Sequence, residues 1–486
     1  MRPRLSLLTK ELIEEIVSEG RKVLCTLGVE IHNENVVSLL ADYGAEIDKE
    51  RQRVRFTPDL IDRGLQTVPR AFRLYDALGR QTHDFSGDSV YFTPGSAAIR
   101  ILDNHSGEMR TPCTGDYIRY VKLVSALPHL ASQSTALIPA DVHENISDSY
   151  RLYLSLLYGE KPVVTGAFTV ESFEVMKDMQ LVVRGNAKDL RARPMAIFTC
   201  CPTSPLKWTD VTSQNLLDCA RWGIPIELVA VPLSGFMAPV TLVGTLIQHT
   251  AENLSGLVIS QLAQPGTPVL YGSSSAIFDI RFETTPLGAI ESMLLTCAAS
   301  EIGKYLGMPT QGYISLSDAK QLDTQAGLET AVGALLATLC GINSISGPGM
   351  LDFESCQSLE KLVVDNEICG MAYRLLQGIE PCEDFPATPL LEELLREQHL
   401  LIADHTRRHL HRQVFFPGPV IDRASRSRWL EEGGMTLRDR AEREVSRQIT
   451  GYIPSRLSDN VKAELTRLME AEAMRVGMEG LPVCES

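Results

Sequence analysis

The stretch LLDCARWGIPIELVAVPL, from Leu216 to Leu233, contains the unit from which the fold is predicted. Its first half ends a helix-length segment, Gly223 is placed to close that helix, and Pro225 prevents its continuation. A short apolar run follows, of the length typical of a buried strand. The stretch therefore predicts a helix followed directly by a strand.

The same arrangement recurs along the chain. Five of the apolar runs are introduced by Gly-Ile-Pro, Lys-Pro, Ala-Arg-Pro, Gly-Thr-Pro or Gly-Met-Pro, and helix-length segments lie between the runs. The runs are Ser89–Ser96, Ala131–Asp141, Lys161–Phe168, Arg193–Pro202, Ile224–Leu233, Thr267–Ser275, Met308–Ser317 and Ile342–Met350. Strands that alternate with helices form βαβ units and a parallel sheet. Eight such units predict an α/β fold of the (β/α)8 TIM barrel type rather than a doubly wound sheet.

Helical patterns flank the predicted barrel on both sides. Residues 1–85 are predicted to form an N-terminal helical cap, and residues 86–380 the barrel. Residues 381–486 are charged and rich in His and Arg, and are predicted to form a C-terminal helical extension.

The composition excludes several classes of function. The formal net charge is −15 and no long Lys/Arg run offsets it, which argues against binding to nucleic acid or to an anionic membrane surface. The sequence lacks an apolar stretch long enough for a membrane span and a signal-peptide pattern. Its 11 cysteines, Cys484 among them, are scattered without a Cys-x-x-Cys pair. Reduced thiols and a cytoplasmic location are therefore expected.

In a barrel of this kind the active site lies at the carboxyl ends of the strands. Aromatic residues near those ends include Phe168, Trp208, Phe236, Tyr313 and Phe353, and they serve either as core packing or as a cage for a quaternary ammonium group. The stretch LSDAKQLDTQAGLE (Leu316–Glu329) leaves the seventh strand. Its polar side chains are either turn and helix caps or the rim of the site.

Other chemistries have weaker signals. A zinc site could draw on Cys200, Cys201 and His143, although adjacent cysteines rarely bind one ion. No dinucleotide fingerprint, phosphate-binding loop or nucleophile elbow is present, and no metal site is predicted.

Five stretches between Tyr271 and Gly378 resemble the trimethylamine methyltransferase family of corrinoid-dependent methyltransferases. They are YGSSSAIFDIR, GAIESML, MPTQGYISLSDAKQLDTQAGLE, GINSISGPGMLDFESCQSLEKLVVDNEI and LLQGIE. The resemblance implies a (β/α)8 barrel that removes a methyl group from a methylated amine. It also implies that the acceptor is Co(I) of a corrinoid on a separate partner protein, with no cofactor bound directly by the enzyme.

Some members of that family contain pyrrolysine, whose position is expected near Met350–Glu354. This chain has only standard residues and is therefore similar to the branch without pyrrolysine. Members of that branch act on quaternary amines of the betaine class, with glycine betaine as the type example. Such substrates carry a permanent charge, so a neutral amine can leave without prior protonation.

The resemblance turns the residues at the strand ends into a predicted substrate site. The ammonium group is expected against aromatic rings and the substrate carboxylate near a cation or neutral donors. The predicted substrate-binding residues are Phe168, Trp208, Arg281, Tyr313, Asp318, Lys320, Gln325, Glu329 and Phe353. Catalytic residues are not assigned. The alternatives are a zinc-thiolate methyltransferase barrel and a non-catalytic betaine-binding protein, and association into a homo-oligomer is expected.

Overall fold

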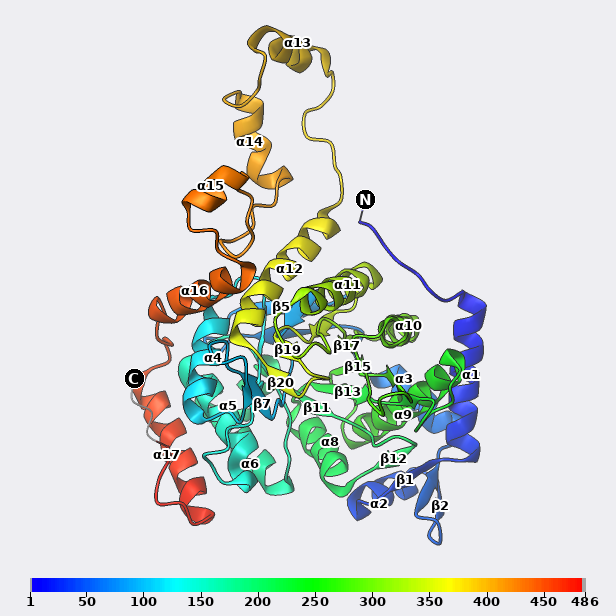
Figure 1. Cartoon of the computed structure of the whole chain (residues 1–486). Coiled ribbons are helices and arrows are strands. Elements are labelled where there is room, and N and C mark those ends of the chain that lie inside the picture. The colour runs from blue at the N-terminus through cyan, green and yellow to red at the C-terminus, as the bar shows by residue number, and fades with distance from the viewer. Residues whose placement is uncertain (1, 483–486) are drawn as a thin grey trace.

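The computed structural model describes residues 2–482, and its centre is a set of eight short parallel strands (Figure 1). Cys484 lies outside the described residues. The strands are β6 (Tyr91–Thr93), β9 (Gln133–Ser134), β10 (Val163–Thr165), β11 (Ala196–Cys200), β13 (Ile226–Ala230), β15 (Val269–Ser273), β17 (Gln311–Tyr313) and β18 (Ser344–Ser346). Each lies inside one of the eight predicted runs, so the strand prediction is confirmed.

Each strand pairs with the next one along the chain. One sheet contains β9, β10, β11, β13 and β15 in that order, and a second contains β17, β18 and β6. Single parallel bridges join the two sheets, from Phe92 to Leu130 and from Tyr271 to Thr310. The pairings therefore run in chain order and return to β6, with all carboxyl ends on one side.

One long helix follows each strand, which confirms the α/β alternation. These helices are α4 (Thr114–Ala126), α5 (Ser147–Tyr158), α6 (Val170–Arg184), α8 (Asp210–Trp222), α9 (Leu242–Ala263), α10 (Ile290–Tyr305), α11 (Thr324–Cys340) and α12 (Leu359–Gln377). Two shorter ones are η1 (Glu144–Ile146) and α7 (Ala187–Ala192). As predicted, α8 ends at Gly223, whose φ of 72° is left-handed. None of the described helices has the length and apolar character that a membrane span requires.

Additional short strands lengthen the loops at the carboxyl ends. They are β7 (Arg100–Leu102), β8 (Met109–Arg110), β12 (Lys207–Trp208), β14 (Leu233–Ser234), β16 (Ala276–Ile277), β19 (Met350–Leu351) and β20 (Cys356–Gln357). The β19–β20 hairpin follows β18, and β20 pairs in parallel with β7. This pairing fixes the loop that leaves the eighth strand.

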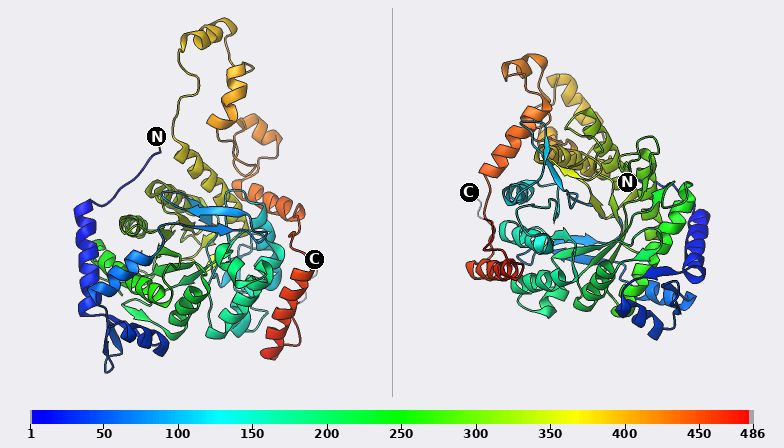
Figure 2. Two further views of the ribbon diagram at one scale, coloured as in Figure 1. Left: turned by 180° about the vertical axis from the view of Figure 1, so that it is seen from behind. Right: turned by 60° about the horizontal axis from the view of Figure 1, so that its bottom comes forward.

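The N-terminal segment covers one flank and the opposite end of the strands. It contains α1 (Lys10–Thr26), α2 (Glu34–Asp42), α3 (Pro58–Thr67), β1 (Val29–Ile31), β2 (Glu46–Asp48), β3 (Arg53–Arg55), β4 (Phe72–Tyr75) and β5 (Gln81–Phe85). Helices α1 and α3 pack against α9, and the blue and green ribbons of Figure 2 show this contact. Phe72 and Phe85 of the β4–β5 hairpin join Val164, Ile197 and Leu270 in an apolar cluster. The hairpin thus seals the strands with apolar side chains.

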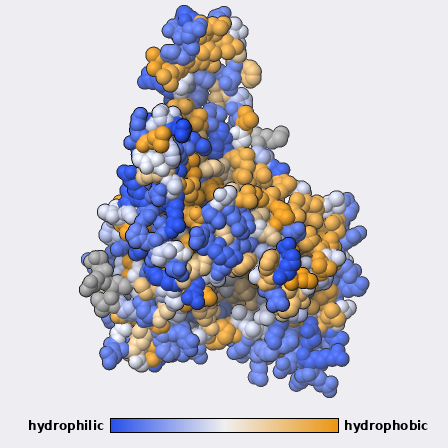
Figure 3. Space-filling view, viewed as in Figure 1, coloured by the Kyte–Doolittle hydropathy of each residue, from blue (hydrophilic) through white to orange (hydrophobic). Residues whose placement is uncertain are grey.

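The C-terminal segment is helical, as predicted. It contains α13 (Thr388–Glu397), α14 (Asp404–Gln413), α15 (Arg426–Glu431), α16 (Leu437–Thr450) and α17 (Asp459–Arg475). Helix α16 packs on α12 and α4, and α17 packs on α5 and α6. Helices α13 and α14 have no buried residues and project from the body, with hydrophobic and hydrophilic side chains mixed at the surface (Figure 3). The domain boundaries at residues 85 and 380 stay predictions.

A buried ion pair fastens the turn after β18 to α12. Lys361 Nζ lies 2.5 Å from Asp365 Oδ2 and also donates to Thr330 Oγ1 of α11 at 2.8 Å. The same Asp365 oxygen accepts the backbone N–H of Gly349 at 2.7 Å. Both charged side chains are almost completely buried. Because each charge depends on the other, this pair couples two helices to the loop of the eighth strand.

We expect Asp365→Ala to lower the free energy of unfolding by about 3–5 kcal/mol, because it leaves the Lys361 ammonium buried without its counter-ion. Denaturant unfolding followed by circular dichroism measures this loss. The double variant Lys361→Met/Asp365→Leu removes both charges and should lose less than the single variant does. A single variant as stable as the wild type would show that the pair does not hold this turn.

Candidate active site

A carboxyl group lies inside the ring of strands. Glu227 of β13 is aligned with Thr199 of β11 and with Leu270 of β15, and Leu270 belongs to the apolar cluster sealed by the β4–β5 hairpin. Glu227 is fully buried, and its Oε1 accepts a hydrogen bond from Thr199 Oγ1 at 2.5 Å. Its Oε2 has no hydrogen-bond partner among the described residues. Burial raises the pKa of Glu227 to about 7.

Strand β17 adds polar groups to the same interior. The Tyr313 hydroxyl lies 2.8 Å from Ser96 Oγ in the loop after β6. Gln311 Nε2 donates to Ser346 Oγ of β18 at 3.2 Å, while Gln311 Oε1 has no partner within residues 2–482. Burial raises the pKa of Tyr313, and the negative charges of Glu354 and Glu227 raise it further. The tyrosine therefore stays neutral near the two carboxyl groups.

The second carboxyl group comes from an unusual backbone segment. Asp352, Phe353 and Glu354 form the turn of the β19–β20 hairpin, and their φ angles of 50°, 56° and 67° are all left-handed. This conformation costs a residue other than glycine roughly 1–2 kcal/mol. Burial, and then the charge of Glu227, raises the pKa of Glu354 to about 8. The Glu354 side chain is thus half-buried at this turn and lies within the electrostatic field of Glu227.

Two contacts hold that turn in place. The Asp352 N–H donates to Ala319 O at 2.9 Å, and Ser355 Oγ donates to Asp352 Oδ2 at 2.7 Å. The first contact joins the loops of the seventh and eighth strands. Strain of this kind persists only where neighbouring contacts over-determine the backbone, and it is frequent at active sites.

The predicted polar cluster after the seventh strand is present and closely bonded. Asp318 Oδ2 accepts the N–H of Gly288 at 2.8 Å. Glu329 Oε2 accepts from Ser317 Oγ at 2.6 Å and from the Asp318 N–H at 2.9 Å, and Gln325 Nε2 donates to Glu329 Oε1 at 2.9 Å. Burial, with a contribution from the charge of Glu329, raises the pKa of Asp318 to about 6. These side chains bind mostly one another and fix the end of β17.

Two of the predicted aromatic residues have a cationic side chain of the protein over their rings. Lys320 Nζ lies 3.8 Å from the ring centroid of Phe353 and 3.6 Å from Asp352 Oδ1. The guanidinium of Arg151 lies 4.5 Å from the ring centroid of Phe168. The structure therefore brings Lys320 and Phe353 together, and it places Phe168 on a neighbouring loop.

Two predicted residues lie away from the strand interior. Trp208 is fully buried in the core, where its indole N–H donates to Ser255 Oγ of α9 at 2.8 Å. The loop after β11 carries it there because β12 pairs with β1. Arg281 is exposed and pairs with Asp279 at 2.5 Å on the loop after β16. Core packing accounts for the position of Trp208, and a local ion pair accounts for that of Arg281.

The sequence prediction missed Thr199, Glu227, Gln311 and Glu354. Glu227 had a readable signal, because it is the one carboxyl group in the apolar run Ile224–Leu233. A charged residue in the middle of a buried strand is rare unless it is paired, hydrogen-bonded or part of a functional site. Glu354 had no comparable signal, since three consecutive left-handed residues without glycine are not expected from sequence.

The cysteines named as zinc ligands do not form a metal site. Within residues 2–482 no group of three or more His, Cys, Asp or Glu side chains is arranged to hold a metal ion. His143 is exposed, where its Nδ1 accepts the N–H of Asn145 at 3.2 Å. Burial raises the pKa of the Cys201 thiol, which keeps that thiol protonated.

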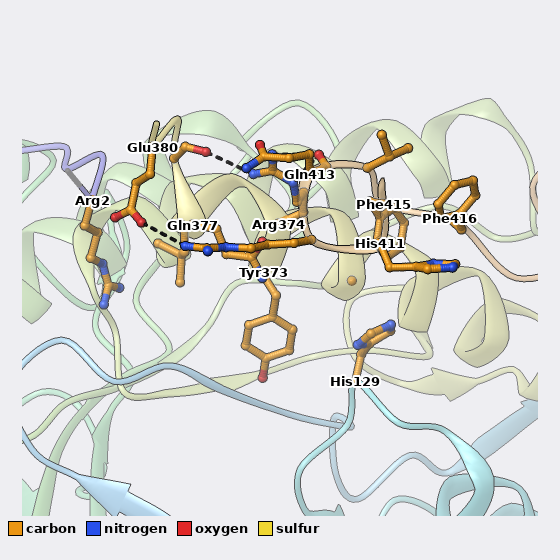
Figure 4. Close-up of a pocket in the computed structure, with 15 residues that line it drawn as sticks. Arg2, His129, Tyr373, Arg374, Gln377, Glu380, His411, Gln413, Phe415 and Phe416 are labelled. Atoms are coloured by element: carbon orange, nitrogen blue, oxygen red, sulfur yellow. Dashed lines mark hydrogen bonds and ion pairs between the residues drawn. The ribbon is translucent and has the colours of Figure 1, made fainter. Parts of the chain in front are cut away.

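A separate cavity of about 730 Å³ lies between α12 and the segment 411–416 (Figure 4). His129, Tyr373, Arg374 and Phe415 line it, and Arg374 uses its donors on the carbonyl oxygens of Gln413 and Gly378. His129 stands just before β9, at the amino end of that strand. The cavity is therefore distinct from the carboxyl groups at the other end.

We expect the wild-type free energy of unfolding to fall as pH rises from about 5 to 8. Glu227 holds its proton in the fold up to a pKa of about 7, against 4.5 ordinarily. The protonated Glu227 contributes fully to stability below its ordinary pKa. This contribution is lost as the pH rises through the pKa that the group has in the folded protein, a change of about 3 kcal/mol in the free energy of unfolding. Denaturant unfolding at four pH values measures this slope. Glu227→Gln should make this slope shallower, and the part that comes from the raised pKa of Glu354 should remain. The exposed-site control Glu283→Gln should keep the wild-type slope, and equal slopes in all three proteins would contradict the assignment.

Comparisons with known proteins show which proteins the chain is similar to. Over 98% of its length the chain is 27% identical to glycine betaine methyltransferase of Desulfitobacterium hafniense (strain Y51), covering 99% of that protein. It is 30% identical to trimethylamine methyltransferase MttB2 of Methanosarcina mazei, over 89% of this chain and 88% of that one. Among solved structures, the monomethylamine methyltransferase of Methanosarcina barkeri superposes with a TM-score of 0.51 at 12% identity, covering 93% of this chain and 89% of that one. The last likeness shows a shared TIM-barrel-like fold.

The model of the family described as "Trimethylamine methyltransferase (MTTB)" matches residues 1–476. The match includes the strands that carry Glu227 and Tyr313 and the loop that carries Glu354. The chain is an enzyme, a methyltransferase of methylamine or betaine metabolism, and it belongs to the trimethylamine methyltransferase family.

Proposed function

We propose that this enzyme demethylates a quaternary amine of the betaine class, glycine betaine first among them. In this proposal the methyl group passes to Co(I) of a corrinoid carried by a separate protein, and the reaction takes place in the cytoplasm. The relatives support the reaction class, since one is named a glycine betaine methyltransferase. The absence of pyrrolysine from the sequence supports a quaternary substrate.

The framework we propose is a (β/α)8 TIM barrel with an N-terminal helical cap and a C-terminal helical extension. The return of the strand pairings from β18 to β6, one helix after each strand, supports it. In this proposal the substrate site lies at the carboxyl ends of the strands, next to Glu227 and Tyr313. Association into a homo-oligomer stays a prediction.

The observation that carries the proposal is the buried Glu227 carboxyl group beside Tyr313. One of its oxygens has no hydrogen-bond partner among the described residues. A quaternary ammonium group has no N–H to donate, so charge and aromatic faces must hold it. An anionic group in a dry, aromatic interior supplies both, and a ring over the cation contributes about 0.5–2 kcal/mol.

The substrate carboxylate needs a cation at the opposite end of the site. Lys320 lies on the loop after β17, with its ammonium over Phe353 and more than half of its side chain exposed. A betaine with its ammonium toward Glu227 would direct its carboxylate outward to Lys320. Arg281 is a less suitable partner, because Asp279 already holds its guanidinium through two hydrogen bonds.

Exposed apolar residues on the strand-end loops support docking of a protein that carries the methyl acceptor. Ile280 is 78% exposed and Phe282 is 72% exposed on the loop after β16, and Phe236 and Val240 are exposed on the loop after β14. Burial of such residues on docking would exclude water from the reacting groups. The enzyme then works chiefly by positioning substrate and acceptor.

Methyl transfer to a Co(I) corrinoid protein tests the proposal. Glycine betaine, carnitine, proline betaine, trimethylamine and choline are each incubated with the enzyme and the reduced corrinoid protein. We expect a betaine to produce the change in visible absorption that accompanies methylation of the corrinoid. Substrate binding without that change would indicate a betaine-binding protein. No response, together with one equivalent of zinc, would indicate a zinc-thiolate methyltransferase.

The docking surface is tested separately with Ile280→Asp/Phe282→Asp. We expect the KM for the corrinoid protein to rise at least about tenfold, because two charges enter an apolar contact. Calorimetric titration with the amine should give an unchanged affinity. Ile379→Asp, at a 96% exposed position far along the chain at the end of α12, is the matched control. An equal effect of the two substitutions would show that the loop is not the docking surface.

A further inference from the structure

We propose that helix α13 of one copy of this chain docks in the cavity between α12 and the segment 411–416 of a second copy. Each copy gives its helix and receives the other's across a two-fold axis, which makes two identical contacts. The cavity lies toward the amino ends of the strands, so this inference goes beyond the proposed reaction and does not rest on it.

Residues 379–416 form an arm that has almost no core of its own. Only Cys382 and Ala403 are buried within it. Its helices α13 and α14 have 10 residues each, and neither contains a buried residue. Helices of this length are marginal in water unless one face packs against another surface. The arm therefore needs packing that its own chain does not supply.

Helix α13 presents an apolar stripe to solvent. Leu391 and Leu395 are four residues apart and therefore lie on one face of the helix. Leu391 is 52% exposed and Leu395 is 73% exposed, while Leu390 and Leu394 beside them are half-buried. A short helix with such a stripe is suited to docking in an apolar groove.

The cavity at the base of the arm offers an apolar wall of suitable size (Figure 4). Its volume of about 730 Å³ is in the range of pockets that enclose a sizeable ligand. Leu376, Val414 and Phe416 contribute to the wall, and the last two are 45% and 56% exposed. These side chains provide the apolar contact for the leucine stripe of the second copy.

The charges of the two surfaces are opposite. Helix α13 contains three glutamates and one arginine. The cavity is lined by three arginines and one carboxylate, that of Glu380. Arg374 donates to the backbone carbonyl groups of Gln413 and Gly378, which carry no formal charge. Opposite charges favour this pairing and fix the direction in which the helix enters.

A second copy is the occupant that this pairing favours, because one chain carries both surfaces. Its own α13 lies at the tip of the arm, away from the cavity at the base (Figures 1 and 2). The protein that carries the methyl acceptor is needed at the carboxyl ends of the strands, which is the other end of the barrel. A two-fold contact uses the same patch on both copies, so that neither helix nor cavity is left exposed.

Sedimentation velocity and hydrogen–deuterium exchange of the full chain test the apolar part of this contact. We expect the wild type to sediment as an assembly with an even number of chains. In Leu391→Asp/Leu395→Asp the assembly should dissociate at the α13 contact, and the amide hydrogens of residues 388–397 should exchange at least about tenfold faster than in the wild type. The matched control Ile453→Asp/Met474→Asp, at positions that are 81% and 68% exposed outside the arm, should change neither measurement.

A mixing experiment tests the charges and shows whether the contact joins two copies. Glu392→Arg/Glu393→Arg makes α13 basic, and His411→Glu/Arg412→Glu makes the cavity less basic. Each variant alone should associate at least about tenfold more weakly than the wild type, because its helix no longer meets a cavity of opposite charge. An equimolar mixture should associate again, since both contacts between unlike variants are favourable.

Unchanged sedimentation and exchange in Leu391→Asp/Leu395→Asp would overturn the proposal. A wild type that sediments as a single chain would overturn it as well, and slow exchange of residues 388–397 in that protein would show that the helix occupies its own cavity. A mixture that associates no better than either charge variant would also contradict the contact. These outcomes leave the proposed function standing, because methyl transfer is measured in a separate assay.

Discussion

The burial of Glu227 is the constraint on which the site depends. A carboxyl group buried on a central parallel strand loses its hydration, and among residues 2–482 only Thr199 donates a hydrogen bond to it. This loss of hydration has two consequences for Glu227. Burial raises the pKa of Glu227 to about 7, so that the group is neutral below about pH 7 and anionic above it, and one of its oxygens has no hydrogen-bond partner among the described residues. In the proposed function a cationic substrate supplies the charge opposite to the Glu227 carboxylate.

The rest of the framework fixes the loops at the carboxyl ends of the strands. The buried Lys361–Asp365 pair holds Gly349, and the β19–β20 hairpin with its left-handed turn at residues 352–354 continues from there. The bonded cluster around Asp318 and Glu329 fixes the end of β17 beside it. Residues away from the proposed substrate site therefore fix the geometry of the loops that surround it. The rings of Phe353 and Phe168 lie against cations of the protein, whereas the Tyr313 hydroxyl lies 2.8 Å from Ser96 Oγ.

Much of the framework could be predicted from the sequence, and less of the site. All eight strands lie in the predicted runs because each run is short and lies between helix-length segments, and five of the runs are introduced by Gly-x-Pro, Lys-Pro or Ala-Arg-Pro, which are local signals. Asp323 begins α11 as its position indicated. Trp208 lies in the core instead, because β12 in the loop after β11 pairs with β1. The two strands are more than 150 residues apart along the chain, and local sequence patterns do not encode such a pairing. Glu354 depends on a strained turn that tertiary contacts impose, and no local propensity favours it.

The central claim is that charge, more than shape, selects the substrate. Calorimetric titration of the wild type with glycine betaine and with 3,3-dimethylbutyrate tests this most directly. In 3,3-dimethylbutyrate a carbon atom replaces the quaternary nitrogen, so the shape is kept and the positive charge is lost. We expect glycine betaine to bind at least about tenfold more tightly than 3,3-dimethylbutyrate at pH 7.5, and Glu227→Gln to remove most of that difference. Equal affinities for the two compounds in the wild type would contradict the account.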